Sequence, residues 1–200
     1  MKKAILYIHG KGGSPKEAEQ YRKNAPGFEM IGVDYPGAFP WTAQGPIREA
    51  YEKACREYDQ VLLLASSIGA YFAMQALGGC GVEKALFISP VLDMEQLILD
   101  LMEKAGVGEE ELRQKGEIPT PFGETLSWPY LTFVREHLLR WSAPTWVLYA
   151  GKDALVPRKT VDRFMAGRQV HLTVMEDGEH WFHTAGQLAF LDRWMENALG

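Results

Sequence analysis

The stretch LLLASSIGAYFAM, residues Leu62 to Met74, decides the fold of this chain. It begins as a continuous apolar run, which is typical of a buried strand, and then passes through two serines and a glycine. Apolar residues follow at a helical spacing, at Ile68, Tyr71 and Phe72. The stretch therefore predicts a strand that turns sharply into a helix, with two hydroxyl groups at the turn.

The two serines at this turn differ in their neighbours. A hydroxyl group at the start of a helix often serves as an N-cap, and this is the structural alternative for both serines. A sharp turn that exposes a nucleophile crowds the backbone, so the residues two before and two after it must be small. Around Ser67 these residues are Ala65 and Gly69, whereas around Ser66 they are a leucine and an isoleucine. Ser67 is therefore the candidate nucleophile, and we expect Ser66 to pack or to cap.

Six short β-rich runs alternate with longer helical patterns along the chain. Five runs are nearly continuously apolar, which is typical of parallel strands covered on both faces, and the last run alternates, which suits an edge strand. The sequence therefore predicts an α/β fold, a mostly parallel six-stranded sheet with helices on both faces. The predicted strands span residues 4–9, 29–34, 60–65, 84–89, 145–149 and 170–175, and the predicted helices span 46–58, 67–77, 157–165 and 184–199.

The interval between the fourth and fifth predicted strands is far longer than the usual connection of about 2 to 6 residues. Helical patterns at 94–105 and 130–139 flank a polar segment, whose acidic run 109–111 we interpret as a solvated helix face. We expect a single domain over residues 1–200 that carries a helical lid insertion at about 91–143. Aromatic residues of the lid either line an apolar acyl pocket or pack the lid on the core: Phe122, Trp128, Tyr130 and Phe133.

Composition and charge limit the classes of protein to which this chain can belong. Its 200 residues, of which 46% are hydrophobic, can bury a sizeable core, and a net charge of −5 gives no basic surface for nucleic acid or an anionic membrane. No apolar stretch approaches the roughly 18 to 20 residues of a membrane span, and the first apolar run ends too early for a secretion signal. Cys55 and Cys80 have no metal-binding spacing. We expect a cytoplasmic protein with free thiols, whose oligomeric state stays open.

Four motifs together resemble the α/β-hydrolase family. The nucleophile motif G-x-S-x-G of that family is present as Ala65 to Gly69, with alanine in the first place. The other motifs follow predicted strands: His9-Gly10-Lys11-Gly12-Gly13-Ser14 after the first, Gly151-Lys152-Asp153 after the fifth and Gly178-Glu179-His180 after the sixth. The order serine, acid, histidine is the one this family has. The resemblance covers the chain apart from the insertion and implies a triad of Ser67, Asp153 and His180.

The residue types suit nucleophilic catalysis. A serine hydroxyl is a weak nucleophile, so it needs an imidazole to accept its proton and a carboxylate to orient that imidazole. The resemblance also implies that the backbone N–H groups of Lys11 and Ile68 form an oxyanion hole. We therefore expect a serine hydrolase, a carboxylic ester hydrolase that forms an acyl-enzyme on Ser67, with a small-molecule acyl substrate and with neither metal nor cofactor.

Other residues compete for two of these roles. His183 is the rival base, although it lies almost one helical turn beyond His180. Asp93, just past the fourth predicted strand, is the rival acid, and its structural alternative is to cap the helix that starts near Met94. We expect His9 to form a structural hydrogen bond and Asp34 to be a loop residue that shapes the floor of the site. His137 lies on a predicted lid helix and His171 within the last predicted strand, so we expect neither to act as the base.

Other functions remain open at this point. Thioesterase, amidase, peptidase and acyltransferase activities use the same triad, because neither fold nor triad chooses the leaving group. A catalytically silent member of the fold that binds or signals is a second class. Nucleotide binding is a third, but Gly10 and Gly12 are followed by Pro15 where a dinucleotide motif needs its third glycine.

Overall fold

The computed structural model describes residues 1–200, and the chain separates into two units. The sheet unit comprises Met1–Leu92 and Arg140–Gly200, and the insertion unit comprises Asp93–Leu139. The insertion unit lies within the interval predicted at about 91–143.

The sheet unit is built on six parallel strands in the order β2-β1-β3-β4-β7-β8. This confirms the predicted parallel sheet, and the alternating last strand does lie at an edge. The strands are β1 (Lys3–Ile8), β2 (Glu29–Gly32), β3 (Gln60–Ser66), β4 (Ala85–Ile88), β7 (Thr145–Ala150) and β8 (Val170–Met175).

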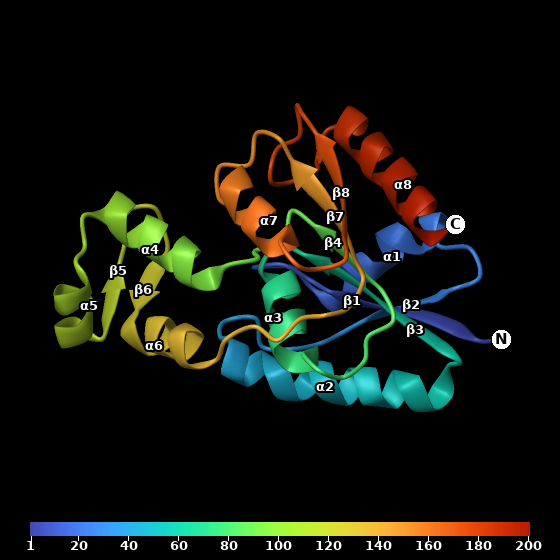
Figure 1. Cartoon of the computed structure of the whole chain (residues 1–200), viewed down its shortest axis with the longest axis horizontal. Helices are drawn as coiled ribbons and strands as arrows, with labels where there is room; N and C mark the ends of the chain where they lie inside the picture. The colour runs from blue at the N-terminus through green and yellow to red at the C-terminus, as the bar shows by residue number, and fades with distance from the viewer. The chain divides into compact units, whose positions relative to one another are not determined.

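Helices cover both faces of this sheet (Figure 1). Helices α2 and α3 pack on β1 and β3 from one face, whereas α1 packs on β2 and α8 packs on β7 and β8. Helix α7 connects β7 to β8. The helices of this unit are α1 (Ala18–Tyr21), α2 (Pro40–Glu57), α3 (Ile68–Leu77), α7 (Arg158–Met165) and α8 (Ala185–Leu199), with 3-10 turns at Pro15–Glu17 and Arg22–Asn24.

The central strands form the core because both of their faces are covered. In β3, Leu63, Leu64 and Ala65 are fully buried, as are Ile5 and Ile8 of β1. Each buried leucine or isoleucine stabilises the folded state by about 1.5–3 kcal/mol relative to an exposed one. The buried residues of β3 therefore anchor its carboxyl end, where Ser67 follows.

Helix α2 begins six residues before the predicted start at Pro46, so that boundary is wrong. Proline is favoured at the first position of a helix, and here Pro40 occupies that position, while Pro46 lies inside the helix. An internal proline removes one backbone hydrogen bond and costs about 3 kcal/mol in a helix interior. Burial of an apolar stripe that includes Ile47 and Tyr51 favours the continuous helix despite that cost.

The insertion unit contains more structure than the two predicted helices. Helix α5 contains the acidic run that we predicted as a helix face, and a two-stranded antiparallel hairpin follows where no strand was predicted. Arg135 forms ion pairs with Glu95 and Glu109, both at 2.7 Å, and so links three helices. The elements are α4 (Met94–Ala105), α5 (Glu109–Lys115), β5 (Glu117–Pro119), β6 (Thr125–Ser127) and α6 (Trp128–Glu136). The helix predicted at 94–105 is confirmed as α4, whereas α6 begins two residues before the helix predicted at 130–139 and ends three residues before its predicted end.

None of these helices combines the length and the apolar character that a crossing of the bilayer requires.

Candidate active site

Three side chains with complementary chemistry follow three strands of the sheet unit. Ser67 follows β3, Asp153 lies three residues after β7, and His180 lies in the loop after β8. Because the strands are parallel, their carboxyl ends meet at one edge of the sheet, where open α/β sheets bind ligands. The fold thus brings together residues that are far apart in the sequence.

Ser67 has a backbone conformation that is rare for a residue with a side chain. Its φ is 52° and its ψ is −124°, so the chain turns sharply between β3 and α3. Neighbouring backbone fixes the turn, since the Ser67 N–H donates to the Ile88 carbonyl and its carbonyl accepts from Val91, both at 3.0 Å. Ser67 occupies the N-cap position of α3, but its side chain makes no capping hydrogen bond. The hydroxyl group is thus available for another role.

Two glycines near Ser67 lie close to neighbouring atoms, and at Gly69 the close contact is with backbone. A Cβ atom at Gly69 would lie 2.3 Å from the carbonyl oxygen of His9, and one at Gly10 would lie 3.3 Å from the Cβ of Ser67. The first distance is a severe overlap with backbone, which has little freedom to move. The glycine-rich loop after β1 therefore packs directly against the turn that carries Ser67.

We expect Gly69→Ala to lower the free energy of unfolding by about 3 kcal/mol, because overpacking against a fixed backbone costs about 1–3 kcal/mol and occasionally more. The matched control is Gly45→Ala in α2, where an added Cβ has no atom within 4 Å. That change should raise stability by about 1 kcal/mol, since alanine is the better helix former. Urea unfolding of both variants measures the difference, and equal stability of the two would contradict the contact at Gly69.

Two hydrogen bonds join the three side chains. His180 Nε2 lies 2.8 Å from Ser67 Oγ, and His180 Nδ1 lies 2.7 Å from Asp153 Oδ2. An ionised carboxylate can only accept, so Nδ1 carries the proton in this arrangement. In the neutral imidazole, Nε2 then has a free lone pair and accepts from the Ser67 hydroxyl group.

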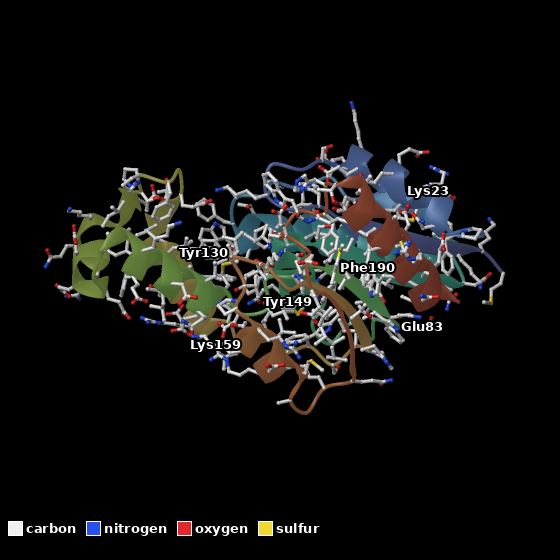
Figure 2. All side chains as sticks on the ribbon, turned by 90° about the horizontal axis from the view of Figure 1, so that it is seen from above. Lys23, Glu83, Tyr130, Tyr149, Lys159 and Phe190 are labelled. Carbon is white, nitrogen blue, oxygen red and sulfur yellow. The ribbon has the colours of Figure 1, made fainter.

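The carboxylate of Asp153 is fixed by its own loop. Its side chain is fully buried, and Oδ1 accepts the backbone N–H groups of Leu155 and Val156 at 2.8 and 3.0 Å. The phenol of Tyr149, inside the sheet unit (Figure 2), donates to the Val156 carbonyl at 2.9 Å. Burial raises the pKa of this phenol, so it stays a neutral donor. Oδ2 is thereby aimed at the imidazole.

The other candidate side chains have separate partners. Asp93 caps α4, since Oδ1 accepts the Gln96 N–H at 2.9 Å, which confirms the structural alternative. His183 is 59% exposed, and its Nδ1 lies 2.8 Å from the Trp181 carbonyl oxygen. His9 Nδ1 lies 2.8 Å from the Gly10 carbonyl oxygen, as expected of a structural histidine. The remaining two histidines and Asp34 are exposed.

The two predicted oxyanion donors lie on segments that adjoin Ser67. Ile68 is the first residue of α3, and the first N–H groups of a helix have no partner within the helix. Lys11 follows Gly10, which packs against Ser67. The predicted pocket residues Phe122, Trp128, Tyr130 and Phe133 all belong to the insertion unit, where Lys104 lies over the ring of Phe122 at 4.5 Å. Their role as a pocket stays a prediction.

Sequence reasoning missed a polar pair beneath the glycine-rich loop. The phenol of Tyr7 in β1 donates to Glu17 Oε2 at 2.7 Å, and Oε1 accepts the Ser14 N–H at 3.1 Å. The spacing Ser14-x-x-Glu17 is that of a capping box, so the sequence did contain a signal for one of these contacts. Nothing in the sequence indicates the contact with Tyr7.

Comparison with known proteins gives structural neighbours only. No protein-family model matches the chain, and no curated protein matches it. Est1E from Butyrivibrio proteoclasticus is similar with a TM-score of 0.78 and 15% identity, over 98% of this chain and 86% of that one.

Two further neighbours agree in architecture. Alpha/beta hydrolase domain-containing protein 10 from mouse has a TM-score of 0.72 and 19% identity, over 97% of this chain and 88% of that one. An alpha-beta serine hydrolase homologue from Coxiella burnetii has a TM-score of 0.64 and 16% identity, over 100% of this chain and 85% of that one. At these low sequence identities, the similarity to the three proteins shows the fold alone.

Proposed function

From the α/β-hydrolase fold that this chain adopts, we propose that it is a serine hydrolase that cleaves a small acyl ester. The observation that carries the proposal is the hydrogen-bonded row of Ser67, His180 and Asp153 at the carboxyl edge of the sheet. A strained serine whose hydroxyl group faces an imidazole nitrogen is arranged as a nucleophile with its base. Several structural neighbours are described as esterases or hydrolases, which supports the same reaction class.

In the proposed reaction, Ser67 Oγ attacks the acyl carbon while its proton passes to His180 Nε2. Asp153 stabilises the imidazolium that forms and holds its orientation. The tetrahedral intermediate places its negative oxygen near the N–H groups of Lys11 and Ile68, and each such donor lowers the barrier by roughly 2.7–4 kcal/mol. Collapse expels the alcohol, which takes the proton from His180, and leaves an acyl-enzyme.

The second half repeats these steps with water. His180 accepts a proton from the water molecule as its oxygen attacks the acyl carbon, and a second tetrahedral intermediate forms. Its collapse returns the proton to Ser67 Oγ and releases the carboxylic acid. Thioester and amide substrates would follow the same route with another leaving group, so ester hydrolysis is the simplest activity to test.

The test is turnover of p-nitrophenyl esters of increasing acyl length, together with labelling by a fluorophosphonate. Est1E has been solved with ferulic acid bound, so methyl ferulate is a useful aromatic ester to include. We expect turnover and one covalent label, located on Ser67 by mass spectrometry. Ser66→Ala is the matched control and should keep both. A label on Ser66, or turnover without any label, would refute the proposed nucleophile.

A further inference from the structure

The glycine-rich loop after β1 has little rigidity of its own. Three of its residues, Gly10, Gly12 and Gly13, are glycines, and Gly12 has a φ of +71°. Glycine loses more conformational freedom on folding than any other residue. An oxyanion donor acts only when it is held about 2.7–3.1 Å from the developing charge. If Lys11 N–H is such a donor, another part of the molecule must hold this loop.

The half-buried carboxylate of Glu17 contacts the glycine-rich loop directly. Oε1 accepts the Ser14 N–H at 3.1 Å. A Cβ atom at Gly13 would lie 2.8 Å from Oε1 and 3.0 Å from Oε2, so the carboxylate lies against the loop backbone. The Gly13 N–H in turn donates to the Gly10 carbonyl at 3.1 Å, which closes the turn around Lys11.

The same carboxylate is connected to the strand that leads to Ser67. Oε2 accepts the phenol of Tyr7 at 2.7 Å, and that phenol oxygen lies 3.5 Å from Ser66 Oγ. Tyr7 is 1% exposed, and burial, the largest cause, raises the pKa of its phenol. It therefore remains a neutral donor and a fixed point in the core. One carboxylate thus joins the loop to β1 and to the residue beside the nucleophile.

We propose that Glu17 is a positioning residue that holds the glycine-rich loop, and with it the Lys11 N–H, in the geometry of an oxyanion hole. The inference rests on the proposed function. Glu17 acts through the loop and does not touch the substrate. Its carboxylate holds the loop through the hydrogen bond from Ser14 and lies against Gly13, and Tyr7 fixes the carboxylate.

Loss of this side chain should slow the chemical step and leave substrate binding nearly unchanged. Removal of an oxyanion donor lowers kcat by about 10²–10³-fold, and a loosened donor should lower it somewhat less. We therefore expect Glu17→Ala to lower kcat for p-nitrophenyl acetate about 30- to 100-fold, with KM within about threefold. A purely structural role would instead lower the melting temperature and the fraction of active enzyme, and kcat per active site, with the sites counted by complete fluorophosphonate labelling of Ser67, would stay near that of the parent.

Glu17→Gln is the conservative variant. Its amide oxygen can accept from Ser14, and its amide nitrogen can donate to the Tyr7 oxygen, so it should recover kcat to within about fivefold of the parent. Tyr7→Phe removes the fixed point but keeps the carboxylate and should lower kcat about tenfold. The matched control is Glu19→Ala, because Glu19 is 70% exposed and pairs with Arg22 at the surface.

The kinetic constants and melting temperatures of these four variants of the full chain test the proposal, together with amide hydrogen exchange of residues 10–14. The proposal is supported if Glu17→Ala has faster amide exchange in residues 10–14 and a lower kcat, and if Glu17→Gln recovers kcat. A kcat equal to that of the parent, or unchanged amide exchange, in Glu17→Ala would overturn the proposal. If Glu17→Ala does not fold, a kcat in Tyr7→Phe equal to that of the parent would overturn it. If the parent has no turnover that depends on Ser67, the proposed function fails, while exchange still decides whether Glu17 holds the loop.

Discussion

His180→Ala is expected to lower kcat for a simple ester by about 10⁶-fold, because removal of the base from a serine triad costs about as much as removal of the whole triad. The structure gives Ser67 Oγ an imidazole partner, His180 Nε2 at 2.8 Å. Without that acceptor the hydroxyl proton has no route away during attack. Steady-state hydrolysis of p-nitrophenyl acetate, with the melting temperature recorded in parallel, measures the effect.

His183→Ala is the matched control for this variant. His183 is 59% exposed, and its Nδ1 lies beside the Trp181 carbonyl oxygen and 3.5 Å from a carboxylate oxygen of Glu179. Its loss should change kcat less than about threefold, as expected of a surface substitution away from the chemistry. If His183→Ala is inactive and His180→Ala is active, then His183 is the base.

Asp153→Asn is expected to be folded and almost inactive, with kcat about 10⁴-fold lower, the loss that the same substitution causes in a serine protease triad. The amide oxygen can still accept the N–H groups of Leu155 and Val156, so the loop keeps its shape. The amide nitrogen then occupies the position of Oδ2 and donates to His180 Nδ1. The imidazole proton moves to Nε2, which faces Ser67 and can no longer accept its proton.

Asp93→Asn distinguishes this interpretation from the rival acid. Asp93 accepts the Gln96 N–H as the N-cap of α4, and asparagine caps a helix about as well as aspartate. This variant should keep its turnover and its melting temperature. Kinetic assays measure the turnover of both variants, and circular dichroism measures their melting temperatures. An active Asp153→Asn together with an inactive Asp93→Asn would identify Asp93, after β4, as the acid.

The local sequence was sufficient for the strands of the sheet. Continuous apolar runs such as that of β3 are buried on both faces, and their boundaries agree with the prediction within one or two residues at most ends. Helix α2 and the hairpin of β5 and β6 were less predictable. Pro46 is tolerated because a buried stripe stabilises the helix around it, and short strands of three residues leave almost no periodic pattern.

The sequence by itself determined which residues could do the chemistry: a serine between small neighbours at the end of a buried strand, and an acid and a histidine after later strands. Only the tertiary structure decided which atoms meet. The 2.8 and 2.7 Å distances around His180 join residues that lie 113 and 27 positions apart, and the contact of Tyr7 with Glu17 joins a strand to a turn. Spacing along a chain fixes local conformation, whereas the parallel sheet and its loops fix which side chains share an edge, because that depends on burial of the whole core.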